Sequence, residues 1–265
     1  MKQTYIIAEI GINHQGDMNI AKRLIDIAAA AGCDAVKFQK RNPDVCVPEE
    51  QKSKLRNWQG EDMTYLEYKH KIEFGKEEYD EIDRYCIKIP SAMITNEDLM
   101  FAAKRTGKKV IISTGMSTFA EIERAITILK LPGDSPETLR PFHLNETADD
   151  NFAVLHCNST YPAPVDELNL SAIKTLKDRF RCEVGYSGHE MLLGTTVSSV
   201  LLGSTILERH ITLDRNMEGS DHSGSVTPHG LFKLVSGVRE LERAYGDGQL
   251  TVTESEKPVR KKLRG

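Results

Sequence analysis

Two histidines each follow an apolar segment that has the composition of a β-strand. His189 closes the segment VGYSG, and His210 closes the segment ILER 21 residues later. Side chains at the carboxyl ends of neighbouring parallel strands lie close together, and neutral imidazoles are common ligands of divalent metals. The pattern predicts a divalent metal on these two histidines, with Asp221 and Glu9 as the nearest carboxylates. The alternative is that each imidazole only caps its own strand through a hydrogen bond.

Two lysines interrupt segments that are otherwise apolar, Lys37 in AVKFQ and Lys88 in IKIPS. Parallel strands are usually buried on both faces, so an ammonium inside them is costly unless it meets an anion. Hydroxyls stand at similar levels of the predicted sheet, on Ser91, Ser113, Ser159 and Ser187. Lysines ringed by hydroxyls predict a receptor for phosphate and carboxylate groups. Alternatively, each lysine extends to solvent from a strand end.

Three further side chains are candidates for the same pocket. Glu9 ends the first predicted strand and is placed to act as an acid, a base or a ligand for a hydroxyl group. Tyr161 precedes Pro162 and either reaches the pocket from a loop or is only a turn residue. Cys157 is expected to pack in the core, because no adjacent base is evident in the sequence.

Strand and helix signals alternate along the chain. Seven strands are predicted, near residues 4–11, 35–39, 86–91, 110–115, 153–159, 182–187 and 205–212. Thr118 with Glu121 has the spacing of a capping box that opens a helix. Reactive side chains after successive strands indicate a TIM-type (β/α)8 barrel, which requires eight strands. The predicted helix that ends at Cys86 runs into Ile87 without turn residues, so one strand–helix unit is expected to be missing there.

The remaining segments complete the predicted organisation. Residues 1–250 form one barrel domain, and residues 251–265 form a loose charged tail or the start of a linker to an absent domain. Residues 41–75 are polar and predict a long irregular loop over the barrel mouth. Residues 131–152 contain several prolines and acids and predict an excursion within the domain. The last helix is expected at about 229–245.

Composition excludes several classes of partner. The chain has 265 residues, 35 basic and 39 acidic, and a formal net charge of −4, which gives no reason to expect nucleic acid or an anionic membrane. Five scattered cysteines indicate reduced thiols. No signal peptide is visible, and no apolar run approaches the ~18 residues of a membrane span. We therefore expect a cytoplasmic protein.

Seven blocks of the sequence, in order and spacing, resemble the sialic acid synthase family. They are AEIGINH (8–14), AVKFQ (35–39), IKIPS (87–91), ISTGM (112–116), HCNSTYP (156–162), GYSGH (185–189) and ERHITLDRNM (208–217). The resemblance implies a β/α barrel that condenses phosphoenolpyruvate with an N-acylated mannosamine-type sugar. The products would be a nonulosonic acid and phosphate, and the cofactor Mn²⁺ or Mg²⁺. It also implies a possible homodimer.

The resemblance assigns a role to each matching position. It implies metal binding by His189 and His210. It implies catalytic roles for a set of five residues: Glu9, Lys37, Lys88, Tyr161 and Asp221. It implies substrate binding by a second, overlapping set: Lys37, Gln39, Lys88, Ser91, Ser113, Ser159 and Ser187.

Four features depart from the family pattern. Met93 stands where a glutamate is often the proposed acid or base, and Ser159 replaces an asparagine that here lies one residue earlier, as Asn158. The third strand–helix unit is not visible, and neither is the small C-terminal antifreeze-like domain. These departures leave three alternatives: another phosphoenolpyruvate-dependent 3-deoxy-ulosonate synthase, a metal-dependent aldolase that uses pyruvate, and a sugar-binding barrel without catalysis.

Overall fold

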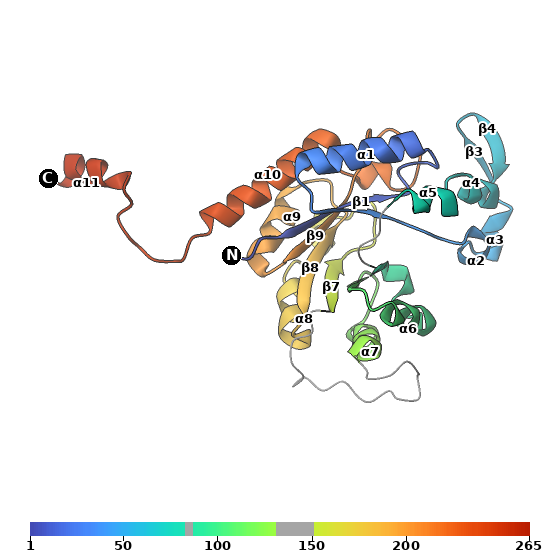
Figure 1. Cartoon of the computed structure of the whole chain (residues 1–265), viewed down its shortest axis with the longest axis horizontal. Helices are drawn as coiled ribbons and strands as arrows, with labels where there is room; N and C mark the ends of the chain where they lie inside the picture. The colour runs from blue at the N-terminus through green and yellow to red at the C-terminus, as the bar shows by residue number, and fades with distance from the viewer. Residues whose placement is uncertain (83–86, 131–150) are drawn as a thin grey trace.

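The main element of the structure is one parallel sheet of seven strands. The computed structural model describes the chain except residues 83–86 and 131–150 (Figure 1). The sheet order is β2-β1-β9-β8-β7-β6-β5, and every adjacent pair is parallel. Its strands are β1 (Tyr5–Gly11), β2 (Ala35–Phe38), β5 (Ile87–Ile89), β6 (Val110–Ser113), β7 (Phe152–Cys157), β8 (Glu183–Gly188) and β9 (Ile206–His210). All seven predicted strands are therefore present, although the start of the 86–91 segment lies outside the described residues.

The sheet is curled, as a side-chain contact across it shows. Lys88 on β5 and Glu208 on β9 stand four strands apart in the sheet order. Strands spaced 4.7–4.9 Å apart would separate these two positions by about 19 Å in a flat sheet. Instead, the Lys88 Nζ to Glu208 Oε1 distance is 3.1 Å. The inner face is therefore a concave wall, and side chains from non-adjacent strands meet inside it.

The inner face is built in two layers because side chains alternate along each strand. The lower layer is an apolar cluster of Ile7, Ile111, Ala153, Leu155 and Ile206 from four strands, with Ala35 of a fifth strand packed against it. On β1, β6 and β9 the side chain two residues further along is polar. Glu9 follows Ile7, Ser113 follows Ile111, and Glu208 follows Ile206. An apolar floor thus supports a polar layer at the carboxyl end of the sheet.

Helices cover the outer face of the sheet. They are α1 (Met18–Ala31), α6 (Glu97–Arg105), α7 (Phe119–Lys130), α8 (Ala172–Phe180), α9 (Gly194–Ser199) and α10 (Pro228–Ala244). Short 3₁₀ turns are η1 (Ser91–Met93), η3 (Val165–Glu167), η4 (Val200–Leu202) and η5 (His222–Gly224). The predicted capping box is confirmed, because the Thr118 backbone N–H donates to Glu121 Oε2 at 2.7 Å and the Glu121 N–H donates to Thr118 Oγ1 at 3.4 Å. The outward residues of the strands and the inward residues of these helices form the principal core.

Arg209 fixes the register of β9 from the helical side. Its side chain is buried on the outer face, where Nη1 donates to Glu190 Oε1 at 3.1 Å and to Thr196 Oγ1 at 2.6 Å. Because neighbouring residues of a strand point to opposite faces, Glu208 and His210 are directed inward. The strand therefore continues through the charged pair at 208–209 rather than ending before it.

The segment 41–75 was predicted as an irregular loop, and this prediction is wrong. It contains α2 (Pro43–Cys46), α3 (Glu49–Lys52), the antiparallel hairpin β3 (Leu55–Trp58) and β4 (Glu61–Thr64), and α4 (Tyr65–Lys71). Trp58, Tyr68 and Ile72 pack with Ile12 in a separate small core. These aromatic contacts stabilise the segment, which lies beyond the carboxyl end of β1 (Figure 1). Helix α5 (Lys76–Asp80) follows it.

The predicted closed barrel is not observed among the described residues. Strands β2 and β5 form the two edges of the sheet. The predicted junction at Cys86 and most of the predicted excursion at 131–152 lie outside the described residues. The structure is therefore an α/β fold with a curled seven-stranded parallel sheet.

The predicted charged tail contains a helix, α11 (Glu256–Arg264), which the sequence analysis did not anticipate. The Thr253 backbone N–H and hydroxyl both donate to Glu256 Oε2, and this local contact opens the helix. None of its residues is buried, and Figure 1 shows it at the end of an extended segment. Within the described residues, no helix combines the length and apolar composition needed to cross a membrane.

The floor of the curled sheet gives a first testable prediction. A Cβ at Gly185 would lie 2.3 Å from the Ile206 carbonyl oxygen and 2.6 Å from Leu155 Cδ2. We expect Gly185→Ala to lower the free energy of unfolding by about 2 kcal/mol or more, through overpacking. Gly194→Ala is the control, because its Cβ would meet no atom within 4 Å. Urea denaturation of both variants measures the difference, and equal stabilities would contradict the close approach of β7, β8 and β9.

Candidate active site

Four buried charges form the centre of the polar layer. Lys37 on β2 pairs with Glu9 on β1, and Lys88 on β5 pairs with Glu208 on β9 at 3.1 Å. Both glutamates are 1% exposed and the lysines are 15% and 9% exposed, so all four groups are largely removed from water. Burial raises the pKa of the Glu9 carboxyl, and the nearby Lys37 ammonium partly offsets this. The predicted inward lysines are thus held inside the sheet rather than extended to solvent.

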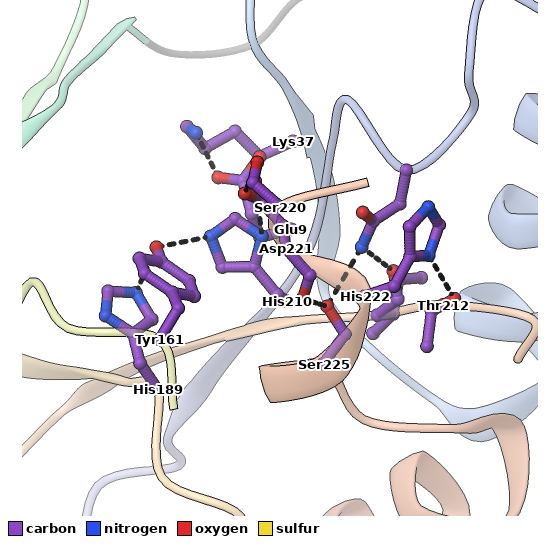
Figure 2. Close-up of polar contacts among 12 residues, drawn as sticks. Glu9, Lys37, Tyr161, His189, His210, Thr212, Ser220, Asp221, His222 and Ser225 are labelled. Atoms are coloured by element: carbon purple, nitrogen blue, oxygen red, sulfur yellow. Dashed lines mark hydrogen bonds and ion pairs between the residues drawn. The ribbon is translucent and has the colours of Figure 1, made fainter. Parts of the chain in front are cut away.

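The two predicted metal-ligating histidines lie together above this layer. The Tyr161 hydroxyl oxygen is 2.7 Å from His189 Nε2 and 3.0 Å from His210 Nε2. The phenol ring stacks on the His189 ring at a centroid distance of 3.9 Å. Figure 2 shows the phenol between the two imidazoles. Both Nε2 atoms therefore point toward one place, and Tyr161 reaches the pocket rather than serving only as a turn residue.

Both imidazoles are in the form that a metal requires. Burial lowers the pKa of His189 to about 3 and that of His210 to about 4, so both rings are neutral near pH 7. His189 Nδ1 lies 2.6 Å from the Asn158 carbonyl oxygen and donates to it, which leaves Nε2 as the lone-pair nitrogen. His210 Nδ1 is buried without a hydrogen-bond partner among the described residues. These features fit a divalent cation held by the two imidazoles.

The two carboxylates predicted near the metal, Asp221 and Glu9, are placed differently around His210: Asp221 lies near its ring, and Glu9 is beside it on the neighbouring strand. Asp221 Oδ2 is 3.8 Å from His210 Nδ1, beyond hydrogen-bond distance (Figure 2). Glu9 is the register partner of His210 across β1 and β9. Within the described part of the chain, no group of three or more His, Cys, Asp or Glu side chains is arranged as a metal site. The protein thus offers two imidazoles, and further ligands would come from water or substrate.

The predicted hydroxyl residues are distributed around the same pocket. Ser187 Oγ donates to Glu208 Oε1 at 2.8 Å, and Ser113 Oγ is buried without a partner among the described residues. Ser91 Oγ accepts from the Gly115 N–H at 3.0 Å. A Cβ at Gly115 would lie 2.1 Å from Ser159 Oγ, so only glycine fits between these hydroxyls.

Three other residues were singled out in the sequence. Gln39 follows β2, and its carbonyl accepts from the Tyr79 hydroxyl at 2.6 Å. Met93 is half-buried against the principal core and offers no titratable group. Cys157 is buried as predicted, and its Sγ lies 3.8 Å from His189 Nδ1, a nitrogen that already donates to the Asn158 carbonyl and so offers the thiol no base. Burial raises the pKa of this thiol, which opposes a nucleophilic role.

Sequence reasoning missed two residues that contribute to the site. Glu208 was noted only as part of a charged pair, although it alternates with Ile206 and His210 and so had to face inward. Asn158 orients the His189 ring through its backbone carbonyl, a contact that no side-chain pattern reveals.

A comparison with protein families identifies this arrangement. The model described as the NeuB family matches residues 24–87 and 86–250. The chain belongs to the NeuB family.

Named NeuB relatives are similar along nearly the whole chain. The N,N'-diacetyllegionaminic acid synthase of Campylobacter jejuni is 36% identical over 298 residues, which cover 99% of this chain and 85% of the relative. The N-acetylneuraminate-9-phosphate synthase of Homo sapiens is 32% identical, covering 98% of this chain and 76% of the relative. The crystal structure of N-acetylneuraminic acid synthetase from Leptospira borgpetersenii, in complex with citrate, has a TM-score of 0.78 and 32% identity, with 99% and 93% coverage. This NeuB chain is accordingly an enzyme of the synthase type.

The buried neutral histidines predict how stability depends on pH. Burial lowers the pKa of His14 to about 4, as it does for His210, whereas an unfolded histidine titrates near 6.5. Below pH 6.5 these histidines become protonated in the unfolded chain but stay neutral in the folded chain. The free energy of unfolding therefore falls as the pH falls toward 4. Each such histidine should remove about 2 kcal/mol of stability between pH 8 and pH 5.

Urea denaturation across this pH range, with chelator present, measures the effect. The Gly16 N–H donates to His14 Nδ1, and His14→Asn retains a side-chain acceptor for it. This variant should reduce the proton uptake on unfolding by about one proton. His229→Asn is the control, because His229 is exposed. Equal stability of the wild-type protein at pH 5 and pH 7 would contradict the buried neutral state.

Proposed function

We propose that this enzyme condenses phosphoenolpyruvate with an N-acylated mannosamine-type sugar, giving a nonulosonic acid and phosphate. The observation that carries the proposal is the placement of two buried ammonium groups, Lys37 and Lys88, in the layer below two neutral imidazoles, His189 and His210. Anion-binding groups and a metal-binding pair thus share one pocket. The sialic and legionaminic acid synthases among its NeuB relatives support the same reaction class.

The lysines bind the phosphoenolpyruvate. An ammonium has three N–H donors, and pairing with one carboxylate uses one of them. The remaining donors of Lys37 and Lys88 face phosphate and carboxylate oxygens, and the hydroxyls of Ser91 and Ser113 add further donors. Since this layer rests on the apolar floor, the enol ester is held at the carboxyl end of the strands.

The acceptor sugar binds on the histidine side of the pocket. His189 and His210 would hold a divalent cation, which supplies Lewis-acid polarisation of the acceptor's aldehyde oxygen when it is bound. Tyr161 and Asp221 flank the histidines and are placed to bind sugar hydroxyls. The phenol that now contacts both Nε2 atoms would then hydrogen-bond to the acceptor instead.

The chemistry follows from these positions. The C3 carbon of phosphoenolpyruvate forms a bond to the aldehyde carbon with the enol electron pair, while the π electrons of the aldehyde C=O bond move to its oxygen. Water adds to C2, and one of its protons goes to the former aldehyde oxygen, which becomes a hydroxyl. The C2–O bond to phosphate then breaks with both electrons leaving on phosphate, which takes the remaining proton of the C2 hydroxyl as the 2-keto group forms. Lys37 and Lys88 stabilise the charge on the departing phosphate. Glu9, which has one oxygen without a hydrogen-bond partner among the described residues, accepts a hydrogen bond from the adding water or from a sugar hydroxyl.

We also infer that the seven strands are a barrel that lacks one strand–helix unit. The two edge strands, β2 and β5, are consecutive strands of this sheet along the chain, so one inserted strand would join both edges. The two matches to the NeuB model meet at residues 86 and 87. The alignment with the Campylobacter jejuni relative spans 298 residues, although this chain has only 265. A unit missing at that junction accounts for these observations.

Phosphate release from phosphoenolpyruvate tests the proposed reaction. The acceptor panel is N-acetylmannosamine, its 6-phosphate, a diacetamido hexose and arabinose 5-phosphate, each with Mn²⁺ and with chelator. We expect release with at least one N-acyl amino sugar, and a loss of at least ~100-fold in His189→Ala and His210→Ala. Release with arabinose 5-phosphate alone would assign a different ulosonate synthase. No release with any acceptor would reject the condensation.

A further inference from the structure

Glu208 occupies a position between two substrate-facing groups. Its side chain is 1% exposed, and its Oε1 accepts from Ser187 Oγ at 2.8 Å while lying 3.1 Å from Lys88 Nζ. Its Oε2 has no hydrogen-bond partner among the described residues. The carboxylate therefore organises an ammonium and a hydroxyl that come from two different strands.

The place of Lys88 in the fold explains why it needs such a partner. Among the described residues, strand β5 comprises Ile87–Ile89, stands at an edge of the sheet and pairs with β6 alone. A lysine side chain has several rotatable bonds, so an edge strand by itself does not fix the ammonium. Glu208 reaches Lys88 from β9, across the hollow of the curled sheet, and holds Nζ over the apolar floor.

Charge reinforces this geometry. The groups that face Lys88 from the other strands are Glu208 on β9, Glu9 on β1 and Cys157 on β7, with Lys37 paired to Glu9. Burial by itself lowers the pKa of Lys88, but the two carboxylates more than reverse this, so the ammonium stays charged. Without Glu208, one of the two carboxylates that oppose the effect of burial would be lost, and the pKa of Lys88 would be lower.

We propose that Glu208 is a positioning residue that fixes the Lys88 ammonium, in its charged form, for binding the anionic groups of phosphoenolpyruvate. The inference rests on the proposed function. Glu208 would affect substrate binding by holding Lys88, without touching the reacting carbons itself. Structural anchoring of β9 is supplied separately, by Arg209 on the outer face.

The test compares Glu208→Gln and Glu208→Asp with a matched control. The amide keeps the size of the side chain and removes its charge, whereas aspartate keeps the charge on a shorter stem. Glu183→Gln is the control, because Glu183 also pairs with a lysine, Lys109, and also accepts from a hydroxyl, that of Thr205 at 2.9 Å. It does so at the amino end of β8, away from the pocket.

Two measurements decide the outcome. Calorimetric titration with phosphoenolpyruvate alone should show binding to the wild type that Glu208→Gln weakens by roughly 10- to 100-fold, the size expected for a lost charged contact. In steady state, KM for phosphoenolpyruvate should rise while kcat changes less. Between pH 7 and pH 9 this KM should climb in Glu208→Gln and stay flat in the wild type. Glu208→Asp should retain the flat profile, and Glu183→Gln should match the wild type in both measurements.

The failures are distinguishable. If the wild type binds phosphoenolpyruvate and Glu208→Gln binds it equally well with the same pH profile, the role of Glu208 is wrong and the proposed function stands. If the wild type shows neither binding nor phosphate release, the proposed function fails and this inference fails with it. A climbing KM in Glu208→Asp as well would show that shape rather than charge is required, which also overturns the proposal.

Discussion

The rest of the structure depends on neutralising charge inside the curled sheet. Two ammonium groups lie where a parallel sheet normally buries aliphatic side chains, and an unpaired ion there would cost several kcal/mol. Each lysine is paired with one glutamate, and the pairs come from both walls of the sheet. The curl is what brings β5 and β9 within reach of each other. Fold and site are therefore linked, because the sheet must bend for its interior charges to be satisfied.

This arrangement also explains why the site lies at one end of the strands. The apolar cluster around Ile7 and Ile206 lies in the amino-terminal half of the interior. One alternation step later, β1, β6 and β9 present the charged or hydroxyl groups of Glu9, Ser113 and Glu208. The histidines stand one step beyond these, next to Tyr161. Along the strand direction the interior thus changes from apolar, to charged and hydroxyl-bearing, to neutral and nitrogen-rich.

Much of this could be predicted from the sequence because the signals are local. The strands at Tyr5–Gly11 and Ile206–His210 each begin with consecutive apolar residues, and the pairing of His189 with His210 follows from their equivalent positions on adjacent strands. The pairing of Glu208 with Lys88 could not be recognised in the same way. It depends on contact with a strand four positions away, and sequence periodicity contains no information on how far a sheet curls.

The wrong prediction for segment 41–75 has a physical cause. The segment is polar on average, but Trp58, Tyr68 and Ile72 meet Ile12 in space, and this tertiary packing orders the segment. Helix α11 was not anticipated, although Thr253 caps it locally and its charged residues favour helices. Average composition does not report such individual contacts, and these contacts determine the structure.

The central claim is that Lys37 and Lys88 form the anion-binding part of a pocket whose other part is the histidine pair. A crystal structure of the protein with phosphoenolpyruvate and Mn²⁺ tests it most directly, because anomalous scattering locates the metal independently of the ligand. We expect an anomalous peak bonded to His189 Nε2 and His210 Nε2, with phosphate or carboxylate oxygens within hydrogen-bond distance of both Nζ atoms. A ligand bound elsewhere, with both lysines still engaged only by Glu9 and Glu208, would contradict it.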